Sequence, residues 1–318
     1  MTNSRRLPVP DALARRPFGR TGLEVHPICL GGAPLGDMPE AFAYSVPEDQ
    51  ALATVRACLD SEINFIDTAN VYGFGESERR IGLVLRERGG RPAGVVLATK
   101  ADRDPDSRRF DGDQARRSVE QSLARLGLDR LQIVYLHDPE YCDQAEVLGP
   151  GGALDALRAL RDQGVIEHLG LAAGPIDMML RYLEQDGFEC VISHNRYTLL
   201  NREAEPLIQA CHERGIAMLN AAPYGSGMLA KGPSQYPRYM YRDAPSELIE
   251  RARRVEEACR RRGLPLAAAA LQFSLRDRRI TSTIVGMTRP ERVQQTLDLA
   301  RLPLPDELWP ELDRAAGF

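Results

Sequence analysis

The sequence predicts an α/β fold, a (β/α)8 TIM barrel, and two observations carry that prediction. Short apolar runs alternate with amphipathic segments of helical period along almost all of the 318 residues. The runs are apolar throughout, without regular alternation, which is typical of parallel strands buried on both faces. Eight such repeats in roughly 250 residues, joined by right-handed crossovers, are expected to close into a barrel.

The eight strands are expected at the short apolar runs. In chain order these are residues 25–30, 64–69, 95–100, 131–137, 168–173, 190–194, 216–221 and 283–286. Helices are expected between them, for instance at residues 48–61, 75–88, 112–126, 152–163, 202–214 and 266–276. A glycine after the last basic turn marks three of the helix ends, at Gly127, Gly164 and Gly215.

A doubly wound open sheet is the main alternative to a barrel. That fold binds dinucleotides through a G-x-G-x-x-G turn after its first strand. Here the first predicted strand is followed by Gly31-Gly32-Ala33-Pro34, which does not supply the motif and offers a poor helix start. The sequence therefore favours the barrel.

Three segments lie outside the eight repeats. Residues 1–17 are expected to form a flexible tail, and residues 18–318 a single domain. Within residues 18–24, Thr21-Gly22 looks like a hairpin turn, and the hairpin is in position to plug the lower end of the barrel. An extended loop, residues 224–246, follows the seventh strand and carries four tyrosines. Loops of this length inside a compact domain are usually functional.

Composition excludes several classes of partner. With 41 basic and 45 acidic residues the net charge is −4, which gives no electrostatic reason to expect nucleic acid. No apolar run reaches the roughly 20 residues of a membrane span, so we expect no membrane association. The six cysteines are scattered without metal-type spacing, and the start resembles no signal peptide. We therefore expect a cytoplasmic protein without a metal site; its oligomeric state stays open.

The expected strand ends bring four polar side chains together. Asp67 lies near the end of the second strand with Tyr72 five residues beyond it, Lys100 ends the third strand, and His137 ends the fourth. In this fold the C-terminal strand ends form the active face. Each residue alone has a structural explanation, but Lys100 is one of only two lysines in a chain whose other basic residues are all arginine. The coincidence on consecutive strands favours a catalytic site.

Proton transfer is the chemistry that suits these four residues. A tyrosine hydroxyl has an ordinary pKa of about 10, so acid–base work near neutrality calls for a neighbouring cation that stabilises the phenolate. Lys100 is expected to be that cation, held by a charge-assisted hydrogen bond to Asp67, and His137 to orient the substrate oxygen. With no nucleophile motif and no metal cluster, proton transfer to or from a hydroxyl or carbonyl fits best.

Residues 65–73 with 75–78 resemble the signature of the aldo-keto reductase family, as do residues 20–25 and 126–129. The resemblance runs from about residue 18 to 295. It implies a (β/α)8 barrel, NAD or NADP as cofactor, and hydride transfer between nicotinamide and substrate carbon. It also implies that Asp67, Tyr72, Lys100 and His137 are the catalytic tetrad, with Tyr72 as general acid/base.

The same resemblance assigns cofactor contacts. Residues 223–229 look like the family's pyrophosphate loop, and residues 286–292 with 295 and 296 like the segment that holds the adenosine end. The implied contacts are His194, Tyr224, Gly225, Ser226, Gly227, Leu229, Gly286, Met287, Thr288, Arg292, Gln295 and Thr296. Gly286 stands where many NADPH-preferring members carry lysine, which leans toward NAD, while Arg292 leaves NADP open.

Two departures from the family pattern concern the nicotinamide end. The usual carboxamide anchors read Ala172-Ala173, and the usual stacking tyrosine reads Ala221. His194 or Asn195 is a candidate to replace the anchors, with a buried structural role as the alternative.

Residues 195–199, 220–223 and the tyrosine-rich loop are similar to the branch of L-fucose (D-threo-aldose), L-galactose and pyridoxal 4-dehydrogenases. This implies an aldose 1-dehydrogenase that gives a lactone, with a pyridoxal 4-dehydrogenase or general aldehyde reductase as alternatives. A regulatory nucleotide-binding subunit of the channel-associated type is the alternative from another class, and a redox-free barrel isomerase is a distant third.

Overall fold

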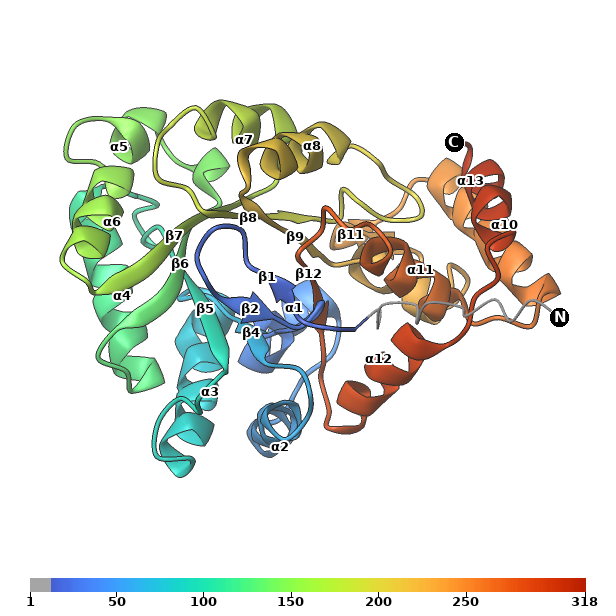
Figure 1. Cartoon of the computed structure of the whole chain (residues 1–318), viewed down its shortest axis with the longest axis horizontal. Coiled ribbons are helices and arrows are strands. Elements are labelled where there is room, and N and C mark those ends of the chain that lie inside the picture. Colours follow the sequence, from blue (N-terminus) through green and yellow to red (C-terminus); the bar gives the residue numbers. More distant parts are fainter. Residues whose placement is uncertain (1–12) are drawn as a thin grey trace, which may run out of the picture.

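The computed structural model describes residues 13–318, and its centre is a closed barrel of eight parallel strands surrounded by helices (Figure 1). Around the barrel the strands follow the order β12-β3-β4-β5-β6-β7-β8-β9. Their bounds are β3 Ile28–Gly31, β4 Phe65–Asp67, β5 Val96–Ala101, β6 Leu131–His137, β7 Ile166–Ala173, β8 Cys190–His194, β9 Ala217–Ala221 and β12 Ser282–Gly286. All eight overlap the predicted strands, so the barrel prediction is confirmed.

The outer layer consists of helices whose apolar faces pack on the strands. They are α2 Glu48–Leu59, α3 Glu76–Glu87, α4 Gly112–Leu126, α6 Ala153–Asp162, α7 Ile176–Tyr182, α8 Glu205–Arg214, α11 Leu266–Leu275 and α12 Glu291–Arg301. Helices α10 Ser246–Arg261 and α13 Leu308–Ala316 lie outside the repeat and pack on each other. Within residues 13–318, every helix is too short or too polar to span a bilayer.

The N-terminal hairpin is formed by β1 Arg16–Pro17 and β2 Glu24–Val25, which pair antiparallel. Between them, Phe18 is buried inside the barrel and meets the ring of Phe65 edge-on at 5.5 Å. The hairpin therefore fills the barrel interior with an aromatic ring, as its position in the sequence predicted.

The boundary of the expected tail needs a correction. Residues 1–12 of that tail lie outside the described residues. Residues 13–17 are packed: Leu13 is buried, and the Arg16 side chain donates hydrogen bonds to the carbonyl oxygens of Ile280 and Leu275. A boundary after residue 17 is therefore wrong by at least these five residues. The burial of one apolar side chain and two charge-assisted hydrogen bonds hold them in place.

Short elements in the strand-to-helix loops shape the C-terminal end of the barrel, which we call the barrel mouth. They are η1 Ala33–Gly36, α1 Pro39–Phe42, η2 Tyr72–Gly75, η3 Pro139–Tyr141, α5 Gln144–Leu148, η4 Gly225–Gly227 and α9 Met228–Lys231. The extended loop after β9 also contains a hairpin of β10 Arg238–Tyr239 and β11 Arg242–Asp243. Its turn residues Met240 and Tyr241 both adopt positive φ, 51° and 63°. Residues other than glycine and asparagine seldom adopt this conformation, so the loop is held by its surroundings.

Candidate active site

The four predicted catalytic residues come from three neighbouring strands. Asp67 is the last residue of β4, Lys100 lies near the end of β5, and His137 is the last residue of β6. Tyr72 begins η2, in the loop that follows β4. Because β4, β5 and β6 are adjacent and parallel, all four residues meet at the barrel mouth.

Lys100 is only 2% exposed and forms a buried ion pair. Its Nζ donates hydrogen bonds of 2.7 Å to Asp67 Oδ2 and of 2.7 Å to the carbonyl oxygen of Thr68. The same Nζ lies 4.6 Å from the centre of the Tyr72 ring. The ammonium group thus has a carboxylate on one side and an aromatic face on another, which fixes it beside the phenol.

His137 is also buried and contacts the ring of Tyr72. The two rings are 5.9 Å apart and nearly perpendicular, at 84°. The imidazole Nδ1 lies 2.5 Å from Asp102 Oδ1, and Nε2 lies 3.5 Å from Asp138 Oδ1. The imidazole ring therefore stands between two carboxylates.

Lys100 was expected to bring the pKa of the Tyr72 phenol below its ordinary value, but its contact is outweighed by other effects. The pKa of Tyr72 is raised well above its ordinary value, first by burial and then by the carboxylates of Asp67 and Asp138. The ion pair explains the failure, because Asp67 neutralises the ammonium charge of Lys100 at 2.7 Å. In this structure Tyr72 is consequently a phenol that holds its proton.

The pKa of His137 is raised despite its burial. Burial alone would lower it, because the charged imidazolium loses water. The nearby carboxylates of Asp102 and Asp138 act in the opposite direction and outweigh burial. His137 therefore stays protonated to a higher pH than an ordinary histidine.

Asp102 is a site residue that was not predicted from the sequence. It directly follows β5, two residues after Lys100, and is 3% exposed. Because side chains alternate along a strand, residues 100 and 102 face the same side, and this spacing was the signal that could have identified Asp102.

Further polar and aromatic groups surround the barrel mouth. Asp138 is half-buried, and Glu140 on η3 accepts a hydrogen bond from the Gly174 amide through Oε1. The other oxygen of Glu140, Oε2, is buried without a hydrogen-bond partner in the described part of the chain. Phe74 and Tyr141 are 84% and 60% exposed, although large apolar side chains are usually covered.

Tyr241, at the tip of the hairpin in the extended loop, faces the same region. Its ring lies 6.4 Å from that of His194 and 5.8 Å from that of Phe42, which it meets edge-on. Its backbone amide donates to the hydroxyl of Ser226, which in turn donates to Asn195 Oδ1. These contacts connect the extended loop to the end of β8.

The predicted pyrophosphate loop has an unusual backbone. Gly225, Ser226 and Gly227 all adopt positive φ, at 56°, 62° and 121°. A Cβ on Gly225 would lie only 2.2 Å from the Tyr239 ring, so this position has room only for glycine. Glycines in such a loop let an anion approach the backbone closely, while the amides of Gly225 and Gly227 donate to the carbonyl oxygens of Ala222 and Tyr224. Tyr224 precedes them and is half-buried, with its pKa raised by burial.

Three residues of the predicted cofactor set have no free polar side-chain group. Leu229 and Met287 are fully buried in the core, and the amide of Leu229 bonds to the carbonyl of Tyr224. The hydroxyl of Thr296 bonds back to the carbonyl of Arg292 within α12. Their side chains pack the core or satisfy the helix, so we do not retain them as side-chain contacts.

The remaining predicted residues at the adenosine end are accessible. Gly286, Arg292 and Gln295 are exposed and Thr288 is half-buried. The side chain of Arg292 forms no ion pair within residues 13–318. The carbonyl of Thr288 accepts a hydrogen bond from Gln50, which fixes the loop before α12.

Lys231, the second lysine, is a basic residue that sequence analysis did not assign to the cofactor site. Its Nζ lies 4.4 Å from the centre of the Tyr236 ring and 5.3 Å from that of Tyr44. Burial, followed by the charge of Arg292, lowers the pKa of Lys231. Two cations thus lie near each other, neither paired with a carboxylate in the described chain.

At the nicotinamide end, Ala172 and Ala173 are buried and offer no polar side chain. Asn195 is fully buried, and both ends of its amide are engaged, by His194 Nδ1 and by Ser226. Burial lowers the pKa of His194 to about 4, so its imidazole is neutral. His194 is half-buried and keeps Nε2 available, which makes it the better candidate of the two.

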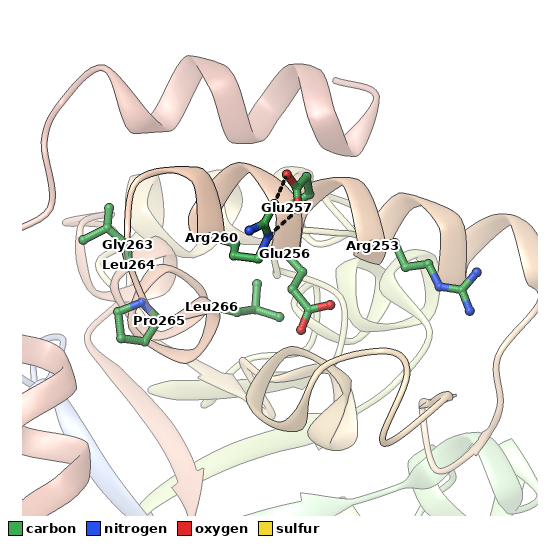
Figure 2. A pocket seen from close by; sticks show the side chains of 8 residues that line it. All are labelled: Arg253, Glu256, Glu257, Arg260, Gly263, Leu264, Pro265 and Leu266. Carbon is green, nitrogen blue, oxygen red and sulfur yellow. Dashed lines mark hydrogen bonds and ion pairs between the residues drawn. The ribbon is translucent and has the colours of Figure 1, made fainter.

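A surface hollow of about 650 Å³ lies elsewhere, between α10 and the start of α11. Figure 2 shows that Glu257 and Arg260, both on α10, pair with each other along one wall. The hollow includes none of the predicted site residues. Within residues 13–318 no three His, Cys, Asp or Glu residues are arranged to hold a metal ion.

The chain is similar to known proteins along almost all of its length. Residues 27–316 match the model of the "Aldo/keto reductase family". The chain is 32% identical to D-threo-aldose 1-dehydrogenase of a Pseudomonas species, over 92% of this chain and 95% of that protein. It is 31% identical to pyridoxal 4-dehydrogenase of Microbacterium luteolum, over 96% and 98%. The structure of aldo-keto reductase AKR11C1 from Bacillus halodurans, in its holo form, superposes with a TM-score of 0.76 at 20% identity, over 95% of each chain, and supports the fold.

Proposed function

Because this chain belongs to the aldo/keto reductase family and is therefore an NAD(P)-dependent oxidoreductase, we propose that it is an aldose 1-dehydrogenase. In this role it oxidises the hemiacetal hydroxyl of a cyclic aldose to a lactone. The observation that carries the proposal is the convergence of Lys100, Tyr72 and His137 at the barrel mouth, beside carboxylates and aromatic rings that suit a sugar.

The proton chemistry belongs to Tyr72 and His137. When bound, the nicotinamide cofactor supplies or accepts the hydride. In carbonyl reduction, the protonated Tyr72 hydroxyl donates its proton to the carbonyl oxygen while His137 Nε2 donates a hydrogen bond to the same oxygen. In oxidation, the hydroxyl proton of the hemiacetal passes to the same groups after they have released their own protons to solvent. Because both groups have raised pKa values and must be deprotonated for oxidation, oxidation should be favoured at higher pH than reduction.

Lys100 holds the phenol in place and is not itself a proton donor or acceptor in the reaction. Its hydrogen bonds to Asp67 and to the Thr68 carbonyl leave it buried, and the face of the Tyr72 ring packs against its ammonium group. A phenolate formed during oxidation would gain a cation within the same contact. Lys100 thus stabilises Tyr72 more strongly in the deprotonated form than in the protonated one.

The residues at the cofactor end suit a dinucleotide. The backbone of residues 225–227 would take the pyrophosphate, and Lys231 and Arg292 would place two positive charges near the phosphates. His194 would meet the carboxamide through Nε2. We propose NAD or NADP as the cofactor, with the absence of a cation at Gly286 leaning toward NAD.

The groups around the barrel mouth suit a ring that carries several hydroxyls. Asp138 and the unpartnered Oε2 of Glu140 are acceptors for hydroxyl donors, and Phe74, Tyr141 and Tyr241 offer aromatic faces. Sugars commonly combine one apolar face with hydroxyls at the edge, so both kinds of contact are used. The 32% identity to D-threo-aldose 1-dehydrogenase supports the same substrate class.

A substrate panel tests the proposal. L-fucose, L-galactose, D-arabinose, pyridoxal and simple aldehydes are each followed through the nicotinamide absorbance, with NAD and NADP in parallel. We expect the highest kcat/KM for an aldose. A higher value for pyridoxal would assign the chain to the chemistry of its 31% identical relative, and no turnover with any compound would contradict the proposal.

A further inference from the structure

Asp102 lies where it can control the imidazole of His137. Continuing the alternation of β5, in which the Ala98 side chain faces the barrel interior, Lys100 and Asp102 point toward the barrel mouth. Asp102 therefore lies at the proposed reaction centre, although it is not one of the four residues of the expected tetrad.

Every polar group of Asp102 has a partner. Oδ1 pairs with His137 Nδ1 at 2.5 Å, and Oδ2 accepts from the backbone amide of Val71 at 3.0 Å. Its own amide donates to the Ser118 hydroxyl at 2.9 Å, and its carbonyl accepts from the Gln114 side chain at 3.0 Å. With four partners and 3% exposure, the carboxylate is held in one orientation.

The contact with Val71 also ties His137 to the loop that carries Tyr72. Val71 immediately precedes Tyr72, so one carboxylate bonds both to the backbone beside the phenol and to the imidazole. A displacement of Asp102 would therefore alter the position of His137 relative to Tyr72.

The direction of the Nδ1 hydrogen bond sets the chemistry of the opposite nitrogen. A carboxylate accepts hydrogen bonds and does not donate them, so His137 Nδ1 carries the hydrogen. The nitrogen that gains and loses a proton is then Nε2, on the side of Asp138. A neutral His137 exposes an acceptor there, and a protonated His137 exposes a donor.

The charged and titratable groups that face His137 come from every side. Asp67 ends β4 and Tyr72 begins η2, while Lys100 lies on β5 and Asp102 directly follows it. Asp138 and Glu140 follow β6, and His194 ends β8. Among these, Asp102 makes the shortest contact with the imidazole that the structure gives, at 2.5 Å.

We propose that Asp102 is a positioning residue: by accepting the Nδ1 hydrogen of His137, it fixes the orientation of the imidazole and directs Nε2 to the substrate oxygen. The inference deepens the proposed function and rests on it for the identity of that oxygen. The pairing of Asp102 with Nδ1 itself is independent of any substrate.

The first test needs no turnover. Nitrogen-15 NMR of the imidazole groups distinguishes protonated Nδ1 from protonated Nε2, and the chain has only five histidines, so a His137→Gln variant assigns the signal. We expect His137 of the intact protein to keep its proton on Nδ1 when it becomes neutral at high pH. A neutral form with the proton on Nε2 would overturn the inference.

The second test uses Asp102→Asn. The carboxamide oxygen can still accept from the Val71 amide, but its NH2 group then donates to His137 Nδ1, so that the neutral imidazole carries its hydrogen on Nε2 instead. We expect the pKa of His137 to fall by about one unit or more and the matching limb of the pH–rate profile to move to lower pH by the same amount. We also expect kcat to fall by about 100-fold, with the cofactor Kd unchanged.

Asp104→Asn is the matched control. Asp104 lies in the same loop, but its carboxylate only accepts from Ser107 and from the amide of Asp106. It should leave the His137 pKa and the pH profile unchanged. If Asp102→Asn behaves like Asp104→Asn, the inference is wrong; if instead no substrate is turned over by the intact protein, the proposed function fails while the NMR result stands on its own.

Discussion

The ammonium group of Lys100 lies 4.6 Å from the centre of the Tyr72 ring and, on its other side, donates a 2.7 Å hydrogen bond to Asp67. This relationship defines the site: one ammonium group contacts both the carboxylate that balances its charge and the aromatic ring of the phenol that it holds in place. Because both charged groups are buried, the ion pair carries a desolvation penalty, and each group needs the other as its counter-charge.

Loss of the cation should destabilise the fold. Lys100→Met leaves the Asp67 carboxylate buried without a counter-charge, which should lower the free energy of unfolding by about 3–5 kcal/mol. Denaturant unfolding followed by circular dichroism measures this change. The double variant Asp67→Asn with Lys100→Met should regain part of the lost stability, and equal stability of the double and single variants would contradict the account.

The pH dependence of the two reaction directions should differ in sign. His137 has a raised pKa and therefore loses its proton at a pH above the ordinary histidine value of about 6.5. Reductive kcat/KM should be constant below that transition and decrease above it, whereas oxidative kcat/KM should increase. The profiles of the intact protein and of His137→Gln give the comparison, and an identical profile in the variant would exclude His137 as the titrating group.

The cations at the cofactor end should govern cofactor affinity. Lys231→Ala and Arg292→Ala each remove an unpaired charge near the predicted phosphates, so each should raise the cofactor Kd by about 10- to 100-fold. Fluorescence titration with NAD and NADP measures both constants. An effect of Arg292→Ala on NADP alone would identify a contact with the 2′-phosphate. Arg253, which lines the surface hollow beside α10, is the control, and Arg253→Ala should change neither Kd.

Phe74 should contribute to substrate binding and little to stability. The side chain is 84% exposed, so Phe74→Ala should leave the melting temperature nearly unchanged. Loss of a stacking contact should raise KM for a ring substrate by about 2- to 10-fold, with the cofactor Kd unaffected. Steady-state kinetics on the best substrate of the panel measures the change, and an unchanged KM would remove Phe74 from the substrate site.

The barrel and the position of the tetrad could be predicted because both depend on local pattern. Continuous apolar runs specify buried parallel strands, and residues at the ends of neighbouring strands must meet at one end of the barrel. The positions of Asp67, Lys100 and His137 at the ends of β4, β5 and β6 follow from this rule alone.

The electrostatics could not be predicted in the same way. The sequence places a lysine beside Tyr72 but does not contain the burial that raises the pKa of the phenol, nor the 2.7 Å contact through which Asp67 neutralises Lys100. Burial depends on how loops from several strands pack together. For the same reason Asp102, one residue beyond a strand, was overlooked, although strand alternation indicates the direction of its side chain.

The cofactor residues show a similar limit. Sequence similarity identified a loop, but whether a side chain in it points outward depends on the local backbone: Leu229 and Met287 turn into the core, whereas Lys231 packs against the rings of Tyr236 and Tyr44 beside Arg292. A residue's place in a segment therefore says less about its contacts than the fold of that segment does.

The most direct test of the central claim is the turnover of Tyr72→Phe, measured through the nicotinamide absorbance on the best substrate. Tyr141→Phe is the matched control, since it removes a hydroxyl from an exposed ring at the same end of the barrel. The account predicts that Tyr72→Phe lowers kcat by about 100-fold or more while the cofactor Kd and the Tyr141→Phe control stay at the level of the intact protein. A Tyr72→Phe variant that retains most of its activity would contradict it.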